Sequence, residues 1–217
     1  MRWNDCVGPY KSYISLGANC QVAYQLSRLG LRQASGPLDW FTSESVPGLV
    51  RLLQHRFKGL MTFRNMRVVD RIGENFVVED PVYDIISYHD FPVYQQNWWD
   101  AYPAFKQKLE RRVNRFWQTL QHKPILFIRT ETTIEEAQQI KAALNTLMHG
   151  GFRLLIVNSH TYPNSEIVDE EWALKDVCCV TVPRGHDWRG SDGAWNRVMS
   201  GFTVQKSQAM SAWHNAP

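Results

Sequence analysis

Cys20 is the residue whose type and position in this sequence most suggest covalent chemistry. It follows the glycine-bearing turn SLGAN, and the stretch NCQVAYQLSRLG has the apolar spacing of a helix, with Asn19 as N-cap and a stop at Gly30. A thiol in the first helical turn faces unpaired backbone N–H groups and the positive end of the helix dipole, so we expect its pKa to fall. The same N–H groups could hold an oxyanion. Free cysteine also often packs as a small hydrophobe, so position alone leaves both interpretations open.

His89 is the best placed of the seven histidines to supply the base that a nucleophilic thiol needs. It lies near the end of the predicted strand YDIISYHDF, and functional side chains of sheet proteins converge where strands end. His160 also follows a predicted strand, and His186 lies in the loop PRGHDW. We expect a His89 ring nitrogen to lie about 3 to 4 Å from the Cys20 sulfur.

The elements that must position these residues alternate along the chain. SYISL, ILFI and LLIV, followed by the shorter CCVTV, are strands without polar alternation, and amphipathic helices separate them. This pattern predicts an α/β fold with a mainly parallel sheet and helices on both faces. Short strands are also expected around residues 67–69 and 76–78. Residues 1–217 show no domain boundary, so we predict one domain, with residues from about 201 to 217 expected to fray.

The strongest predicted helix, residues 102–120, carries a basic face. Its apolar residues recur at three- and four-residue steps, and its cations lie mainly off that stripe: Lys106, Lys108, Arg111, Arg112 and Arg115. Such a face can hold an anionic partner, but a solvated helix surface has the same composition, and we favour the solvated surface. The net charge of +3 does not indicate nucleic acid.

Several blocks of the sequence resemble a known family. SLGANC, Gly36-Pro37-Leu38-Asp39-Trp40, YHDF and ILFIR are similar to a bacterial family of unknown function described as papain-like cysteine peptidases. The resemblance runs from about Ser15 to the helix holding Trp195, with Leu38 where phenylalanine is more frequent.

The resemblance implies a catalytic pair of Cys20 and His89. Asp39 is our preferred third residue, and Asp90 and Asn158 are the alternatives. Papain-like proteases also carry a glutamine shortly before the nucleophile. Ile14 stands six residues before Cys20, so Asn19 or backbone N–H groups would have to replace the glutamine, which weakens the case for peptide hydrolysis specifically.

Two classes of function follow. The first is a cysteine-dependent hydrolase or acyl-transferring enzyme working through a Cys20 thioester on a small-molecule, peptide or glycan substrate. The second is a non-catalytic glycan- or nucleotide-binding protein whose cleft is lined by some of the nine tryptophans. Asn19, Trp40 and Trp188 are the candidate substrate-binding residues, and we expect Trp188 or Trp195 to share a cleft with Cys20. The oligomeric state stays open.

Other kinds of site are not indicated by the sequence. Nucleotide-binding and metalloprotease motifs are missing, and adjacent Cys178 and Cys179 should point to opposite faces of a strand, so we expect neither cofactor nor metal. The first residues lack the apolar core of a signal peptide, and no apolar run is long enough to span a bilayer. Because the four cysteines lack a disulfide framework spacing, we expect a reduced, cytoplasmic protein without membrane insertion.

Overall fold

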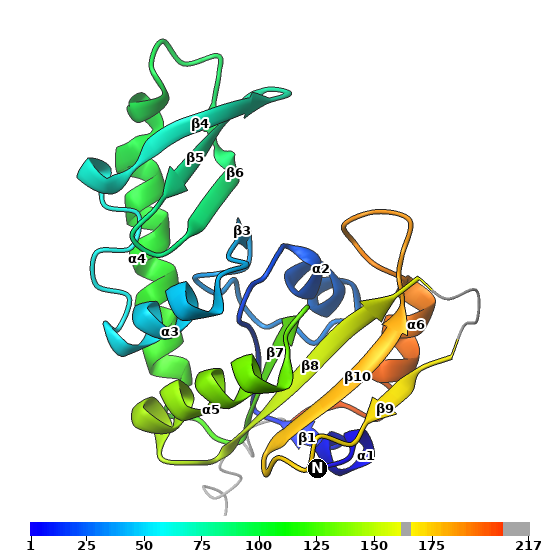
Figure 1. Ribbon diagram of the computed structural model, residues 1–217. Helices are drawn as coiled ribbons and strands as arrows, with labels where there is room; N and C mark the ends of the chain where they lie inside the picture. The colour runs from blue at the N-terminus through cyan, green and yellow to red at the C-terminus, as the bar shows by residue number, and fades with distance from the viewer. Residues whose placement is uncertain (162–165, 206–217) are drawn as a thin grey trace, which may run out of the picture.

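A mainly parallel sheet forms the centre of the computed structural model, which describes residues 1–161 and 166–205 (Figure 1). The first four strands in spatial order are parallel and the last is antiparallel. In that order they are β2 (Ser12–Ser15), β7 (Ile125–Thr130), β8 (Phe152–His160), β10 (Val177–Pro183) and β9 (Val168–Glu170). The predicted α/β class and the neighbouring, parallel SYISL, ILFI and LLIV strands are therefore confirmed. A helical half set against a β-barrel half, as in papain itself, is not what the chain forms.

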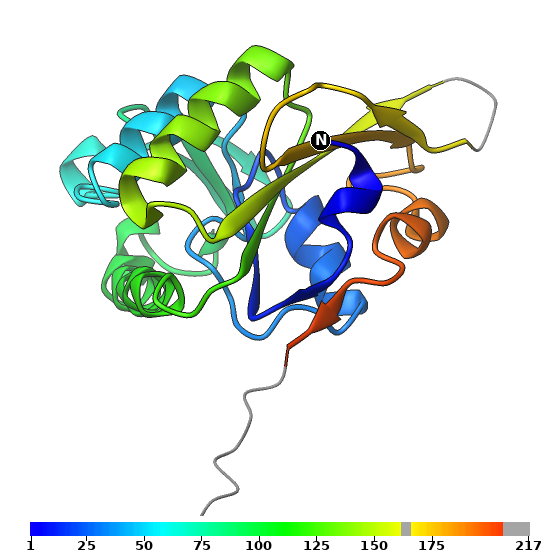
Figure 2. The same cartoon turned by 90° about the horizontal axis from the view of Figure 1, so that it is seen from below.

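Helices cover both faces of this sheet, as Figure 2 shows from below. One face packs against α3 (Val46–Gln54), α4 (Tyr102–Thr119) and α5 (Ile134–Met148). The other packs against α1 (Trp3–Cys6), α2 (Gln21–Arg28) and α6 (Asp192–Val198). The central strands are apolar on both sides because both sides are covered. Cys178 and Cys179 accordingly lie in opposite cores, as predicted.

A second sheet, antiparallel and four-stranded, lies beside α4 (Figure 1). Its order is β3 (Phe41–Thr42), β6 (Ile85–Pro92), β5 (Asn75–Asp80) and β4 (Arg67–Ile72). The sequence indicates strands near β4, β5 and β6, whereas β3 begins in a stretch expected to be a loop, and the sequence does not indicate that the four form a sheet of their own. The strand carrying His89 therefore belongs to a different sheet from the strand that leads to Cys20. Two short 3-10 helices flank this region, η1 (Phe63–Asn65) and η2 (Trp98–Ala101).

The two ends of the described chain lie together. β1 (Pro9–Tyr10) pairs in parallel with β11 (Thr203–Val204), and a disulfide joins Cys6 to Cys178. The disulfide corrects our expectation that all four cysteines are reduced, and the cytoplasmic location inferred from that expectation loses its support. Residues 206–217, most of the segment expected to fray, lie outside the described residues. In the ranges that are described, none of the helices combines the length and apolar character needed to cross a bilayer.

Candidate functional site around Cys20

The turn before Cys20 is held by close contact with β3. Gly17 and Ala18 have φ values of 79° and 71°, in the left-handed region that favours glycine. Ser43 accepts a hydrogen bond from the Ala18 N–H through its Oγ at 3.2 Å and donates its own N–H to the Ala18 carbonyl at 2.9 Å. A Cβ on Gly17 would lie 2.2 Å from Ser43 Oγ. The SLGA stretch therefore needs glycine for both its backbone conformation and its packing.

Arg129 fixes the same turn from inside the protein. It belongs to β7 and is fully buried, and it donates to the carbonyls of Leu16 at 2.7 Å, Ser43 at 2.6 Å and Glu44 at 3.1 Å. Burial lowers its pKa to about 10, which still leaves it charged at neutral pH. Arg129 thus joins the turn before Cys20 to the end of β3.

Cys20 occupies the N-cap position of α2, one residue later than the cap predicted at Asn19. Asn19 still serves the helix, because its Oδ1 accepts the Gln21 N–H at 2.9 Å. The N–H groups of Val22 and Ala23, in the first turn, have no acceptor anywhere in the described part of the chain. The thiol is therefore at the predicted end of the helix, beside donors that are unpaired.

The electrostatic environment of Cys20 is the reverse of what the sequence indicates. Burial raises the pKa of its thiol to about 11, and the negative charges of Asp39 and Asp90 add to the rise. The expected fall in pKa is therefore wrong for this structure, because loss of water and two carboxylates outweigh the helix dipole. Cys20 rests as a neutral thiol at pH 7.

Asp39 lies near Cys20, but its carboxylate is hydrogen-bonded within its own loop. Its Oδ2 accepts from Arg32 Nε at 2.8 Å and from the Gly36 N–H at 2.8 Å, and its side chain is 3% exposed. These bonds anchor the turn at Gly36. Trp40 lies on the same loop, with the Arg32 guanidinium 5.3 Å from its ring centre.

His89 lies on a β-bulge of β6. The pairing with β5 changes from Phe76–Phe91 to Val78–Ser87, so residues 88–90 face a single residue. Regular alternation would place His89 on the buried side with Ser87 and Phe91, but the bulge leaves it exposed. Among the described residues, the His89 ring and the Cys20 thiol share no hydrogen bond, and the His89 ring instead contacts Tyr88 at 6.4 Å between centres.

Asp90, the neighbour of His89, takes the inward position. Its carboxylate accepts from Ser87 Oγ at 2.8 Å and forms an ion pair with Lys108 of α4, and its side chain is 6% exposed. Asp90 is thus the residue of the YHDF block whose charge reaches the Cys20 thiol. Its carboxylate is bonded to Ser87 and Lys108 and not to the His89 ring.

Asn158, the remaining alternative for a third catalytic residue, has a structural role. Its amide accepts from the Thr132 N–H at 2.8 Å and donates to the Thr132 carbonyl at 2.9 Å. It therefore joins the end of β8 to the loop after β7.

A pocket of about 420 Å³ lies at the carboxyl ends of β7, β8 and β10. Asn19 and Trp188, two of the predicted substrate-binding residues, both line it, and Gln21 lies beside them. Cys20 itself is not among its lining residues. Trp188 is 49% exposed, whereas Trp195 is fully buried in the core. The structure thus brings Asn19 and Trp188 together and leaves Trp40 elsewhere.

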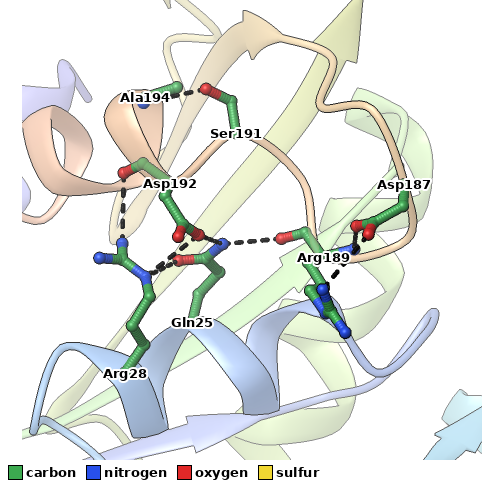
Figure 3. Close-up of polar contacts among 7 residues, drawn as sticks. All are labelled: Gln25, Arg28, Asp187, Arg189, Ser191, Asp192 and Ala194. Atoms are coloured by element: carbon green, nitrogen blue, oxygen red, sulfur yellow. Dashed lines mark hydrogen bonds and ion pairs between the residues drawn. The ribbon is translucent and has the colours of Figure 1, made fainter.

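The loop carrying Trp188 is docked on α2, as Figure 3 shows. Gln25 Nε2 donates to the Arg189 carbonyl at 2.7 Å and to Asp192 Oδ1 at 2.8 Å, and Arg28 pairs with the same carboxylate at 3.1 Å. Trp188 packs edge-on against Tyr24 at 5.6 Å between ring centres. The helix that begins at Cys20 therefore also supports one wall of the pocket.

Sequence reasoning missed the cations that surround this region. Arg129 follows the apolar run ILFI within β7, and a charged residue there is an available signal, since a buried arginine must bind something. The sequence favours a solvated surface for the basic face of α4, but Lys108 pairs with Asp90, and Arg112 is half-buried. Lys106 likewise turns inward, donating to the Leu60 carbonyl at 2.7 Å.

The fold and site define the class: an α/β protein with a mainly parallel sheet and a buried thiol at the start of the helix that follows β2, an edge strand of that sheet. Within that class, the chain belongs to the family described as "Putative papain-like cysteine peptidase (DUF1796)", whose model matches residues 11–159. The family description is that of a cysteine hydrolase.

A viral protein is a relative of this chain. The "Uncharacterized protein R408" of Acanthamoeba polyphaga mimivirus is 29% identical over 136 residues, which span 55% of this chain and 61% of the relative. Because this relative is viral, it does not support the expectation that the family is bacterial. No solved structure matches the chain.

Proposed function

We propose that this protein is a cysteine-dependent hydrolase or acyl-transferring enzyme with Cys20 as its nucleophile. The observation that carries the proposal is the place of the thiol, at the N-cap of α2 beside the unpaired N–H groups of Val22 and Ala23. Donors of this kind stabilise the oxyanion of an acyl-transfer intermediate, and they supply what the missing glutamine would otherwise contribute. Family membership supports the same assignment.

In the proposed reaction a base takes the thiol proton and the sulfur attacks the carbonyl carbon of the substrate. The oxyanion collapses to a thioester as the leaving group departs with a proton, and water or an acceptor nucleophile then attacks the thioester and restores the thiol. The resting pKa of about 11 makes the base essential, because few thiols are ionised at neutral pH.

His89 remains our candidate for this base. The bulge that exposes its ring also places the next residue, Asp90, within the electrostatic reach of Cys20. A change in the bulge that exchanged the two side chains would turn the imidazole to the inward side, where the Asp90 carboxylate now lies. Asp39, given its bonds to Arg32 and Gly36, is proposed as a positioning residue for the loop.

Trapping the acyl-enzyme tests the nucleophile. The protein would be incubated with a series of activated esters of different acyl groups and analysed by intact-protein and peptide mass spectrometry. We expect one acyl group on Cys20, absent from Cys20→Ala and still present in Cys179→Ala, which removes the other free cysteine. His89→Ala should slow acylation at least tenfold with the fold intact. The proposal would be refuted if no ester labelled Cys20, or if Cys20→Ala were labelled to the same extent as the unmodified protein.

A second candidate is a binding protein that uses the pocket at the sheet edge. It is favoured by the joint placement of Asn19 and Trp188 in a pocket beyond strand carboxyl ends, where α/β proteins bind ligands. Titration with oligosaccharides and nucleotides, followed by tryptophan fluorescence, would test it. Saturable quenching should disappear in Trp188→Ala and persist in Trp99→Ala, a similarly exposed control. An unchanged signal in Trp188→Ala would exclude this pocket.

A further inference from the structure

Arg112 lies on the face of α4 that is turned toward the site. One turn before it, Lys108 pairs with Asp90. One turn after it, Arg115 and Phe116 line a cavity of about 50 Å³ that Arg32 and Asp39 also line. Residues three and four apart share one side of a helix, so Arg112 lies between the two carboxylates that Cys20 also experiences.

The guanidinium of Arg112 has no partner of its own in the described ranges. It is half-buried, yet no hydrogen bond or ion pair holds it. The nearby carboxylates are already used, Asp39 by Arg32 and Asp90 by Lys108. The two carboxylates therefore face Arg32, Lys108 and Arg112, with the exposed Arg115 close by, so positive charge is in excess here and Arg112 is the half-buried cation that neither carboxylate pairs. Burial lowers the pKa of Arg112, because the guanidinium has lost water. The negative charges of Asp90 and Asp39 partly offset this fall, although neither carboxylate is bonded to the guanidinium.

We propose that Arg112 binds an anionic group of the substrate, a carboxylate or phosphate, and so makes the enzyme selective for acyl compounds that carry a negative charge near the reacting carbonyl. This inference rests on the proposed role of Cys20. A guanidinium presents paired N–H donors that match a carboxylate or phosphate in two parallel hydrogen bonds. The carboxylates that hold Arg32 and Lys108 prevent those cations from competing for the ligand.

Alkylation of Cys20 by two small reagents tests the site without requiring catalysis. Iodoacetate is anionic and iodoacetamide is neutral, and both modify the same sulfur. Their rates on Cys20 would be measured by peptide mass spectrometry at one pH near 9. We expect the ratio of iodoacetate to iodoacetamide rates to fall about tenfold in Arg112→Gln and less in Arg112→Lys, which keeps the charge but not the paired donors. Arg111→Gln, an exposed neighbour on the same helix, should leave the ratio unchanged.

Competition in the unmodified protein gives a second measurement that does not depend on a folded variant. Inorganic phosphate or acetate should slow iodoacetate more than iodoacetamide, beyond the effect of chloride at equal ionic strength. The anion site would be overturned if the ratio of iodoacetate to iodoacetamide rates were the same in Arg112→Gln and in the unmodified protein. It would also be overturned if the ratio fell equally in Arg111→Gln, or if phosphate and acetate did not compete specifically with iodoacetate. A rate ratio that does not depend on Arg112, in a protein that still forms the acyl-enzyme, refutes only this inference, whereas an Arg112-dependent ratio without any acyl-enzyme refutes only the proposed function.

Discussion

The main lesson at the scale of single residues is that surroundings decide the state of a cysteine. A helix start lowers a thiol pKa by a modest amount, whereas burial with two carboxylates nearby raises it. In Cys20 the rise caused by burial and the two carboxylates is larger than the fall caused by the helix, and the pKa reaches about 11. Position along a helix is visible in a sequence, but the carboxylates come from residues 39 and 90, which only the fold brings near.

We predict that the pH profile of Cys20 alkylation lies on the alkaline side. The thiolate is the reactive form, and its fraction rises about tenfold per pH unit until pH passes the pKa. Alkylation by iodoacetamide in the folded protein should therefore be slow at pH 7 and continue to rise up to about pH 11. The unfolded protein, whose thiol has its ordinary value of 9.0, should level off earlier. A folded-state plateau below pH 9 would contradict the structure.

At the scale of elements, local patterns could be predicted and long-range pairings could not. The Thr-x-x-Glu spacing predicts the capping box that Thr133 and Glu136 form, and Ser191 caps α6 where the sequence offers Ser191 or Asp192, because each cap depends on residues within one turn. The separate antiparallel sheet and the bulge at residues 88–90 depend on which strands meet, and no local spacing encodes that. The exchange of His89 and Asp90 across β6 follows from the bulge, so the candidate site was only partly predictable.

Gly17→Ala should destabilise the protein and disturb the turn that leads to Cys20. The positive φ of Gly17 costs a residue with a side chain about 1 to 2 kcal/mol, and the clash with Ser43 Oγ adds to this. Urea unfolding would measure the loss. In the double variant with Ser43→Ala the nearest contact becomes an ordinary one, at 3.5 Å to Ser43 Cβ, so the double variant should lose less than the sum of the two single variants. Strict additivity would show that the clash is not present.

At the scale of the whole molecule, the disulfide joins segments that lie outside the family match. Cys6 precedes residue 11 and Cys178 follows residue 159, so the bond connects α1 to β10 across the entire matched region. It cross-links residues 172 apart in sequence, and such a loop restricts the unfolded chain strongly. No feature of the sequence predicts this bond, because the spacing of two distant cysteines carries no local pattern.

Cys6→Ser should lower the free energy of unfolding by about 2 to 4 kcal/mol in non-reducing buffer. Adding a reductant should lower the stability of the unmodified protein by a similar amount and leave Cys6→Ser unaffected. Cys20→Ala, which does not touch the disulfide, should respond to the reductant as the unmodified protein does. A Cys6→Ser variant as stable as the oxidised parent would show that the bond contributes nothing to folding.

The same closed loop changes how the molecule would respond to mechanical force. When the chain is pulled from Met1 and Gln205, tension passes through the Cys6–Cys178 bond, so the residues between the two cysteines carry no load. At about 3.5 Å per extended residue, this shielded segment holds roughly 600 Å of hidden length. In a force-extension trace the oxidised protein would lengthen only by its two flanking segments, which include residues 179–183 of β10. The strands β2, β7 and β8, and Cys20 with them, would come under tension only after reduction.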